Sequence, residues 1–395
     1  MQTKLLSEIS LTIGSGLTPL RSNPKFWDNG TISWLKTEQL GEKYIYSTNE
    51  LISKNALEET SIKVFPTDSL SIAMYGEGKT RGNLSILKKP MTTNQACCNV
   101  VIDSNKANFE YVYYYLKTQY EALRSLSSGV RKNLNSSDIK NYPINLPDSL
   151  EEQESIAKVL KSLDDKIELN NKISTELEIM AKTLYDYWFV QFDFPDADGK
   201  PYKSSGGKMV YNEILKREIP EGWGDCSLGD ITELYQPQTI SEKEMLDEGR
   251  YLVYGANGIV GRYDQYNHEE SVVTITCRGN SCGTINFTRP FSWITGNAMV
   301  VKPKSVLLVP DYILNLLSSS GVDNVITGSA QPQITRTNLS PLSVINPNQE
   351  MLKKYASIAT NLFEKRICIL EENEMLAKLR DWLLPMLMNG QVTVN

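Results

Sequence analysis

The sequence contains a single histidine, and this scarcity removes two common classes of enzyme. A Ser/His/Asp or Cys/His nucleophile system needs a histidine beside its nucleophile, so either one would have to use His268. His268 lies in the polar stretch YNHEE at residues 266–270, and no sequence typical of a nucleophile turn is near it. We therefore predict no catalytic residue in this chain.

Cysteines are also few, and their spacing does not suit a metal. The six are Cys97, Cys98, Cys226, Cys277, Cys282 and Cys368. A tetrahedral zinc site needs cysteines and histidines at characteristic spacings, which these positions do not supply. The sequence predicts no metal site and no disulfides, and the thiols are expected in the core.

Long hydrophobic runs are absent as well. The longest apolar runs fall far short of the ~18 residues that a membrane helix requires. The first ten residues lack the apolar core of a signal peptide. The expected location is therefore the cytoplasm, without contact to a membrane.

Two short motifs resemble catalytic ones but stand in the wrong context. Residues 73–80 (AMYGEGKT) satisfy the loose form of a phosphate-binding loop, which requires a helix after it. The alternating residues 84–87 predict a strand there instead, so a Gly-rich β-turn is the better interpretation. Residues 195–200 (PDADGK) imitate a nuclease motif without its separating hairpin, and we interpret them as a surface turn.

What the sequence does contain is a long internal repeat. Residues 69–101 align with residues 271–301 at a shift of about 200, which places residues 95–96 on residues 297–298. A repeat of this length that occurs twice indicates domain duplication, because the repeats of solenoid proteins run about 20 to 50 residues. The length of the chain also suits two or three domains, each able to bury its own core.

Each copy of the repeat is followed by a long amphipathic helix with a heptad seam. The predicted seam residues are Ile156, Leu160, Leu163, Ile167, Leu177, Ala181, Leu184 and Trp188 in residues 151–192, and Ile358, Leu362, Ile369, Leu376, Leu379, Leu383 and Met386 in the second helix. Polar residues interrupt both seams near their centres, Asn170 and Ser174 in the first and Lys365 and Glu372 in the second. Such breaks cost stability but fix register, so we predict an antiparallel coiled coil within the chain. The alternative is that each helix packs only on its own β-rich domain.

The predicted length of the helices sets the distance between the two domains at their ends. A helix of about 40 residues spans roughly 60 Å. An antiparallel pair would hold two similar domains at its opposite ends, and turns of the DNA major groove recur about every 34 Å. Such a pair would set the spacing between two sites that the domains read on duplex DNA.

Polar side chains suited to base edges and phosphates gather in the predicted loops of both copies. Arg and Lys pair with guanine, and Asn and Gln pair with adenine. Because such residues recur at matching places in the two copies, we predict that they bind DNA. The candidates are Lys36, Lys79, Arg81, Asn94, Gln95, Arg131 and Lys132 in the first copy, and Asn257, Arg278, Asn280, Asn297, Gln331, Gln333 and Arg336 in the second.

The two copies differ in net charge. Residues 1–147 carry 17 basic and 13 acidic side chains, a net charge of +4, whereas residues 223–347 carry 8 and 12, a net charge of −4. A DNA-binding protein that acts alone is normally basic, because phosphate neutralisation supplies much of its affinity. The whole chain has a net charge of −6, so we expect partner subunits to contribute most contacts to the DNA backbone. The acidic residues 148–192 suit the docking of another protein.

Three further segments resemble one protein family. They are the segment that joins the first helix to the second copy, residues 192–223; the entry to the first helix, with Pro147, Gln153 and Ile156; and the closing segment LRDWLLPMLMNGQV at residues 379–392. Together these segments resemble the specificity subunits of Type I restriction-modification systems, over essentially the whole chain. The joining and closing segments are the more specific, because the β-rich parts vary within that family with the sequence that each one reads.

The resemblance implies two target-recognition domains, each reading one half of a bipartite DNA site, and helices that set the gap between the halves. It implies no catalysis by this chain. Two adenine-methylating modification subunits would dock on the helices, and two restriction subunits, which are ATP-dependent translocases and nucleases, would join for cleavage. S-adenosylmethionine, ATP and Mg²⁺ are expected on those partners and no cofactor on this chain, which lacks the methyltransferase motifs Asn-Pro-Pro-Tyr and Asp-Pro-Pro-Phe.

The predicted fold class is α+β, with two pseudo-repeated β-rich target-recognition domains joined by two long helices that form an antiparallel coiled coil. The predicted division is 1–147 for the first domain, 148–192 for the central helix, 193–222 for a hinge, 223–347 for the second domain and 348–395 for the C-terminal helix. The helix residues predicted for subunit docking are Ile156, Leu163, Ile167, Leu362, Ile369 and Leu376.

Two other functions stay open. One is a stand-alone NTPase or hydrolase built around residues 73–80. The other is a non-catalytic tandem β-domain protein that binds a carbohydrate or a phage protein, or serves as a scaffold, and does not read DNA. The lack of a strongly basic composition keeps this second alternative open.

Overall fold

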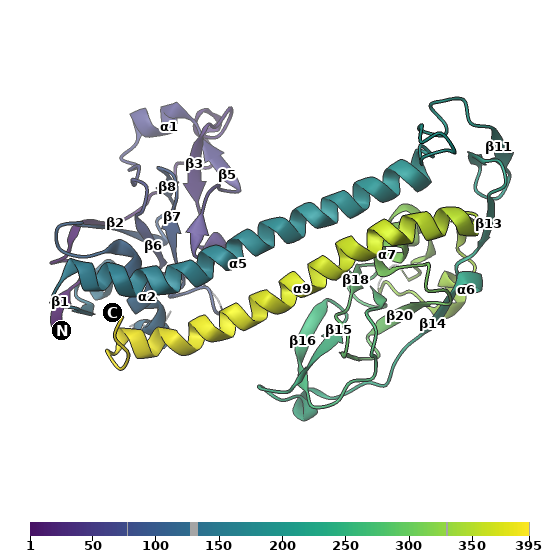
Figure 1. The fold of residues 1–395 in the computed structure, drawn as a ribbon. Helices are drawn as coiled ribbons and strands as arrows, with labels where there is room; N and C mark the ends of the chain where they lie inside the picture. Colours follow the sequence, from purple (N-terminus) through teal and green to yellow (C-terminus); the bar gives the residue numbers. More distant parts are fainter. Residues whose placement is uncertain (77, 127–132, 329–330, 395) are drawn as a thin grey trace. The chain divides into compact units, whose positions relative to one another are not determined.

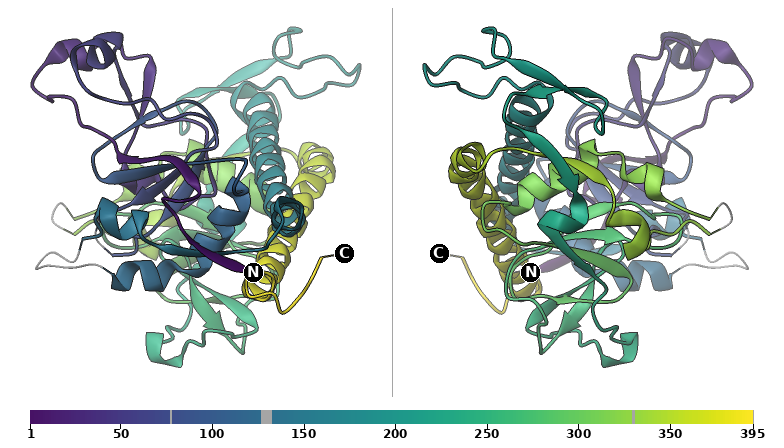
Figure 2. Two further views of the ribbon diagram at one scale, coloured as in Figure 1. Left: turned by 90° about the vertical axis from the view of Figure 1, so that its left-hand side faces the viewer. Right: turned by 90° about the vertical axis from the view of Figure 1, so that its right-hand side faces the viewer.

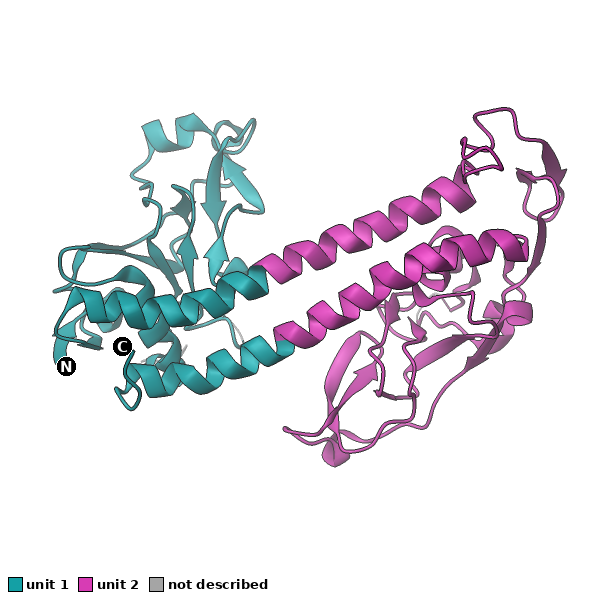
Figure 3. Cartoon of the chain, in the orientation of Figure 1, with its two compact units in different colours: residues 1–168, 374–395 teal, residues 169–373 magenta. Residues whose placement is uncertain are grey.

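The chain forms two compact units, and both long helices contribute to each of them. The computed structural model describes residues 1–76, 78–126, 133–328 and 331–394. Unit 1 consists of Met1–Glu168 and Glu374–Asn395, and unit 2 consists of Leu169–Asn373 (Figure 3). Unit 1 therefore takes up segments from both ends of the sequence.

The described residues of unit 1 form three sheets (Figure 1). Its strands are β1 (Gln2–Leu5), β2 (Ser10–Ser15), β3 (Ile32–Leu35), β4 (Tyr44–Ile45), β5 (Glu50–Ile52), β6 (Leu70–Ala73), β7 (Leu84–Leu87), β8 (Thr92–Thr93), β9 (Cys97–Ile102) and β10 (Pro143–Leu146). The largest sheet has the order β2-β9-β6-β7-β4, the second has the order β5-β3-β8, and β1 pairs with β10. Strands β6 and β7 are buried along their whole length, which explains their continuous apolar and small side chains.

Helices complete the core of unit 1. The short ones are α1 (Lys54–Glu59), α2 (Phe109–Thr118), α3 (Tyr120–Ser125) and α4 (Ser136–Lys140), with 3-10 turns at η1 (Pro24–Phe26) and η2 (Thr37–Gln39). Helix α2 starts at Asn108, whose Oδ1 accepts the backbone N–H of Tyr111 at 2.9 Å, the usual way an N-cap satisfies a free donor. Its tyrosine-rich middle packs in the same core as Leu387 and Met388 from the end of the chain.

Unit 2 repeats this architecture. Its strands are β11 (Met209–Asn212), β12 (Arg217–Pro220), β13 (Gly224–Ser227), β14 (Thr232–Tyr235), β15 (Tyr251–Gly255), β16 (Gly258–Tyr263), β17 (Val273–Thr276), β18 (Ile285–Phe287), β19 (Trp293–Ile294), β20 (Ala298–Pro303) and β21 (Ser343–Asn346). Its short helices are α6 (Leu228–Ile231), α7 (Pro310–Ser319) and α8 (Arg336–Leu339), with 3-10 turns at η4 (Glu242–Glu244) and η5 (Val322–Val325). The sheet orders are β14-β20-β17-β18, β16-β15-β19 and β13-β21.

Three of the unit 2 sheets have a counterpart in unit 1, whereas the β11-β12 pair has none among the described residues. The order β14-β20-β17-β18 matches β2-β9-β6-β7, and β16-β15-β19 matches β5-β3-β8, including one parallel pair at the same edge. The pair β13-β21 matches β1-β10. The duplication predicted from sequence is therefore confirmed at the level of strand order.

The structural repeat differs from the sequence alignment by one residue. Ala73 pairs with Cys97 in unit 1, and Thr276 pairs with Ala298 in unit 2. Cys97 thus corresponds to Ala298, and Ala96, rather than Gln95, corresponds to Asn297. The predicted match of residues 95–96 with 297–298 was wrong by one residue, and so was the match of residue 69 with residue 271, because the buried strands lack the polar alternation that would fix their register.

The two long helices are α5 (Leu150–Tyr185) and α9 (Gln349–Met388). Ser149 caps the first by accepting the N–H of Glu152 at 3.1 Å, and Asn348 caps the second by accepting the N–H of Met351 at 2.9 Å. Helix α5 ends in a π-helical turn, η3 (Asp186–Val190). In both units the helices lie side by side and run antiparallel (Figures 1 and 2), so this part of the predicted fold class is confirmed.

Residues 193–222, predicted as a hinge, are folded into unit 2. Asp196 accepts the backbone N–H groups of Asp198 and Lys200 through its Oδ1, which confirms the predicted surface turn. Strands β11 and β12 form a hairpin, and the Phe194 ring stacks on Trp223 with centroids 5.0 Å apart. This segment therefore contributes to the core of unit 2.

None of the helices within the described ranges is long and apolar enough to cross a membrane.

Candidate nucleic-acid interface

In unit 1, the backbone brings three predicted recognition loops together. The N–H of Met74, after β6, donates to the carbonyl of Ala96, before β9, at 2.8 Å. The N–H of Leu134 donates to the carbonyl of Met74 at 3.1 Å. The segment after β6, the turn before β9 and the segment before α4 are therefore neighbours.

Unit 2 has the same framework. The N–H of Cys277 donates to the carbonyl of Asn297 at 3.4 Å, and the N–H of Ile334 donates to the carbonyl of Cys277 at 2.9 Å. Arg278 and Gln333 also form a β-bridge. The same two backbone hydrogen bonds thus gather three loops in both copies, although the loop sequences differ.

We call residues 256–258, 277–284, 295–297 and 331–336 the unit 2 loop cluster. The first of these loops joins the others where the Thr276 hydroxyl donates to the carbonyl of Ala256. All seven candidates predicted in this copy belong to the cluster, and all seven have exposed side chains: Asn257, Arg278, Asn280, Asn297, Gln331, Gln333 and Arg336. A set of exposed amides and guanidinium groups on one loop surface can offer hydrogen bonds to base edges and phosphates.

The unit 1 candidates are less uniform. Lys79 is exposed, and its loop is held by α3, where the Tyr120 hydroxyl donates to the Lys79 carbonyl at 2.5 Å and Arg124 Nη2 donates to the Gly78 carbonyl at 2.9 Å. Arg81 is half-buried. The candidates Arg131 and Lys132 lie outside the described residues.

The candidates Asn94 and Gln95 lie in the turn before β9 and differ in what their side chains do there. The Asn94 side chain accepts the N–H of Ala96 at 3.1 Å, so it holds the turn before β9. The Gln95 side chain is exposed and accepts the Thr18 hydroxyl. Asn94 is therefore a structural residue of the turn, whereas Gln95 remains on the surface.

Lys36 is already paired within the unit. Its ammonium lies 2.7 Å from Glu38 and 2.8 Å from Glu50, and Glu50 also binds Arg21. Hydrogen bonds to Glu38 and Glu50 raise the pKa of Lys36 above its usual range. A phosphate would have to compete with two carboxylates for this lysine, so Lys36 is the weakest of the described candidates.

Sequence patterns missed a buried ionic cluster in unit 1. Asp164 of α5 accepts Arg380 Nη1 of α9 at 2.9 Å and the Tyr114 hydroxyl of α2 at 2.5 Å. Its Oδ2 also lies 3.4 Å from the Lys43 ammonium. Burial lowers the pKa of Lys43, and burial together with the Asp164 charge raises the pKa of Tyr114 far above its usual range. This Asp164 cluster joins the β-rich part of unit 1 to both long helices.

Unit 2 has a counterpart built from different residues. Arg366 of α9 donates through Nη1 to Asp311 of α7 at 2.8 Å and through Nη2 to Glu178 of α5 at 3.3 Å. The Arg366 guanidinium also lies over the Phe287 ring of β18, 4.9 Å from its centroid. Asp311 is fully buried, and burial raises its pKa to about 6 although Arg366 opposes the shift. The sequence signal for this Arg366 cluster was a charged residue on the side of α9 that faces the core.

The polar centre of the helix pair is a hydrogen-bond network within unit 2. Asn170 Nδ2 donates to Glu372 at 2.7 Å and to Asn373 at 2.9 Å, and Asn373 donates to Asn171 at 2.8 Å. These contacts span α5 and α9, so the predicted polar break holds the helices in one register. The alternative, in which each helix packs only on its own β-rich domain, is wrong.

The helices also bury a second face, which corrects part of the predicted seam. Ile156 of α5 packs in the core of unit 1, so it is not available to a docking partner while that unit is folded. Ile358 and Leu379 of α9 are exposed rather than in the seam. The heptad pattern failed there because each helix packs on a β-rich domain as well as on the other helix. The other predicted docking residues are half-buried: Leu163, Ile167, Leu362, Ile369 and Leu376.

The residues examined for catalysis or metal binding have structural roles. His268 is buried, with Nε2 2.8 Å from the Tyr235 hydroxyl and Nδ1 2.6 Å from Asn267 Oδ1, and burial lowers its pKa to about 4. Strand β7, antiparallel to β6, confirms the strand that was predicted after the Gly-rich motif in place of the helix of a phosphate-binding loop. Within the described part of the chain, no cluster of His, Cys, Asp or Glu could hold a metal ion.

The cysteines follow the prediction with one exception. Cys97, Cys98 and Cys277 are buried, and Cys226 and Cys282 are partly buried. Cys368 lies on the exposed side of α9, so the expectation of a core thiol is wrong there. Successive residues of a helix point in different directions, so Cys368 faces solvent although the preceding residue, Ile367, faces the core.

Comparison with known proteins gives a consistent result. The family model described as "Type I restriction modification DNA specificity domain" matches residues 1–179 and 220–377. The MjaIX specificity subunit of Methanocaldococcus jannaschii is 29% identical over 97% of this chain and 91% of its own length. The EcoprrI specificity subunit of Escherichia coli is 22% identical over 89% of this chain and 86% of its own length.

A solved structure shares the fold. The crystal structure of a Type I restriction-modification S subunit from M. genitalium superposes with a TM-score of 0.61 at 17% identity. The match covers 98% of this chain and 95% of that one. Both β-rich domains and both long helices thus lie within a known architecture.

Proposed function

Because the chain belongs to the family of Type I restriction-modification DNA specificity domains, we propose that it is the specificity subunit of such a complex and has no active site of its own. In this proposal each β-rich domain reads one half of a bipartite DNA site through major-groove contacts. Modification subunits carry the adenine methylation, with S-adenosylmethionine, and restriction subunits carry the ATP- and Mg²⁺-dependent cleavage.

The repeated loop framework is the observation that carries this proposal. Met74, Ala96 and Leu134 make the same backbone connections in unit 1 as Cys277, Asn297 and Ile334 make in unit 2. A fixed framework with different loop side chains suits two readers of two different sequences, because base identity is read by side chains while the framework only positions them. We therefore assign residues 1–147 and 223–347 as the two target-recognition domains.

The long helices serve two purposes in this proposal. Their length sets the number of unread base pairs between the half-sites, and the helices, of which the first is acidic, dock the modification subunits. Residues 148–192 carry 5 basic and 10 acidic side chains, which disfavours contact with phosphates and suits a protein partner. Those partners would supply the basic surface that the second domain, with a net charge of −4, lacks.

The test is to co-express the full chain with its modification subunit in a host without adenine methylation and to map methylated adenines by single-molecule sequencing. We expect a split motif with a fixed unread gap. Arg278→Ala should weaken discrimination at one position of one half-site by about 1–3 kcal/mol. Asp247→Ala, an exposed change in unit 2 outside the loop cluster and the long helices, should leave the motif unchanged.

Two outcomes would count against DNA reading. A stable complex with the modification subunit but no new methylation would contradict it. The absence of any complex would favour the alternative of a non-catalytic tandem β-domain binding or scaffold protein, for which the acidic second domain is the supporting observation. Nucleotide binding by the isolated chain that Lys79→Ala abolishes would instead favour an NTPase.

A further inference from the structure

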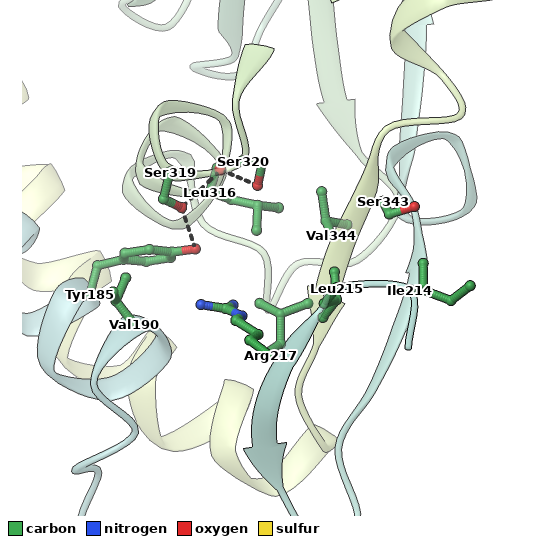
Figure 4. Close-up of a pocket in the computed structure, with 11 residues that line it drawn as sticks. Tyr185, Val190, Ile214, Leu215, Arg217, Leu316, Ser319, Ser320, Ser343 and Val344 are labelled. Atoms are coloured by element: carbon green, nitrogen blue, oxygen red, sulfur yellow. Dashed lines mark hydrogen bonds between the residues drawn. The ribbon is translucent and has the colours of Figure 1, made fainter. Parts of the chain in front are cut away.

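A cavity of about 310 Å³ lies within unit 2, beside the hairpin that β11 and β12 form (Figure 4). Its walls come from the end of α5, the hairpin, the last turn of α7 and strand β21. This volume is at the small end of ligand cavities and suits one inserted side chain better than a cofactor. The cavity lies outside the loop cluster proposed to read DNA.

Arg217 is the charged group of this cavity. Its guanidinium extends toward Tyr185 and Val190 (Figure 4), and it lies over the Phe192 ring, 5.1 Å from the centroid. Within the described ranges, no carboxylate forms an ion pair with it. Burial lowers the pKa of Arg217, as expected for a cation removed from water without a full counter-charge.

The neighbouring hydroxyl groups only partly compensate this charge. Ser319 and Ser320 both donate to the carbonyl of Leu316, at 3.1 and 2.6 Å, and the Tyr185 hydroxyl lies 3.4 Å from Ser319 Oγ. The last turn of α7 adds the partial negative charge of a helix C-terminus, roughly half an elementary charge. These groups leave the guanidinium without a full counter-charge, so its donors suit a full anion.

The rim of the cavity indicates which kind of anion fits. Val190 and Ile214 line the cavity and are exposed, and Val210 and Tyr211 of the hairpin are exposed as well. Residues 193–222 carry five basic and six acidic side chains, a net charge of −1, so this surface does not suit a polyanion such as DNA. An apolar rim around one cation instead complements a protein segment with one carboxylate among apolar residues.

We propose that this cavity receives an Asp or Glu side chain of a partner subunit, with apolar residues beside it resting on the hairpin. The guanidinium would bind the carboxylate in the bidentate geometry that Arg favours. This inference rests on the proposed function, which supplies the partner subunits. It assigns a docking role to the hairpin and to the wall that α7 and β21 of the second recognition domain form, apart from the loop cluster proposed to read DNA.

The experiment places a photo-crosslinking amino acid at Ile214 in the full chain, assembled with its modification and restriction subunits. We expect mass spectrometry to find a crosslinked partner peptide with a carboxylate between apolar residues. Arg217→Gln should lower the yield roughly tenfold, the effect of losing one charged hydrogen-bond pair. Lys216→Gln, which removes an adjacent exposed charge, should leave the yield unchanged, and a crosslinker at exposed Val306 should not give this peptide.

A second measurement needs no variant and so does not depend on the folding of one. Sodium phenylacetate should compete with the wild-type crosslink, whereas its neutral analogue 2-phenylethanol and inorganic phosphate should not. An unchanged yield in Arg217→Gln, or crosslinks to DNA alone, would overturn the docking proposal. Adenine mapping on the same complexes separates the two ideas, because a missing split motif contradicts the proposed function, whereas an intact motif without the crosslink contradicts only the docking site.

Discussion

Asp311 shows how one buried residue makes the stability of unit 2 depend on pH. Its Oδ1 accepts from Arg366, but its Oδ2 is buried with no hydrogen-bond partner among the described residues. Burial raises the pKa of this carboxyl to about 6, whereas an unfolded aspartate titrates near 3.9. Between these two values the folded protein holds an extra proton, so stability falls as the pH rises.

The corresponding experiment compares wild type with Asp311→Asn in urea unfolding at several pH values. The difference of about two pKa units corresponds to roughly 3 kcal/mol. From about pH 4 to pH 6 the wild type should lose that much stability relative to the variant. Asp247→Asn, at an exposed position of the same unit, should show no such trend. A pH-independent difference for Asp311→Asn would contradict the raised pKa.

For single residues, the sequence predicted which side chains are exposed better than it predicted which groups those side chains contact. Gln333 lies in an exposed loop and Arg336 at the exposed start of α8, as their polar context indicates. Lys36 was predicted by the same reasoning but pairs with Glu50 from β5, a strand that follows later in the chain. A pairing of this kind depends on strand order, which local residue patterns do not contain.

At the scale of elements, the paired helices allow a direct test of spacing. Removing residues 171–177 from α5 and 367–373 from α9 takes one heptad from each and keeps Glu178 facing Arg366. Each helix shortens by about 10 Å, so we expect an unread gap about three base pairs shorter, with both half-sites unchanged. Adenine mapping measures the gap.

Removing residues 171–177 alone is the control for this deletion. It shifts α5 against α9 and breaks the contacts of one cluster, so methylation should be lost. If the paired deletion methylates with the original gap, helix length does not set the spacing.

Helices and strands were predictable from the sequence where a hydrophobic pattern repeats over many residues. Both long helices show a heptad pattern in the sequence, and in the structure Ser149 and Asn348 cap them. The hairpin of β11 and β12 was not predicted, because its residues alternate for only four positions on each side. Its place in unit 2 depends on aromatic packing of Phe194 and Trp223, which lie far apart in the sequence.

For the molecule as a whole, the two ionic clusters determine which domain exchanges should succeed. Replacing residues 1–147 with the first domain of a relative should change one half-site and leave the other intact. A donor with a lysine and a tyrosine at the places of Lys43 and Tyr114 would keep the partners of Asp164. Adenine mapping and the yield of folded complex measure the two effects.

A donor with apolar residues at both positions is the informative comparison. Of the partners named above, the buried Asp164 carboxylate would then keep only Arg380. Removing one partner of a buried ion pair destabilises a protein by about 3–5 kcal/mol. We expect a lower yield of complex from this exchange. A change in both half-sites after either exchange would contradict the assignment of one domain to each half.

The duplication was visible in the sequence, but the division into units was not. The repeat predicted two similar domains, and the strand orders confirm them. The packing of Leu387 and Met388 into the core of unit 1 could not be predicted, because it joins residues more than two hundred positions apart. Such a contact follows from the antiparallel pairing of α5 and α9 rather than from any local pattern.

That contact has a consequence for synthesis. The core of unit 1 contains Leu6 and Ile9 together with Leu387 and Met388, whereas unit 2 is one continuous segment, Leu169–Asn373. On the ribosome, unit 2 has all of its residues before translation ends. Unit 1, although its β-rich part is made first, has to wait with an open apolar face until the last helix emerges from the exit tunnel.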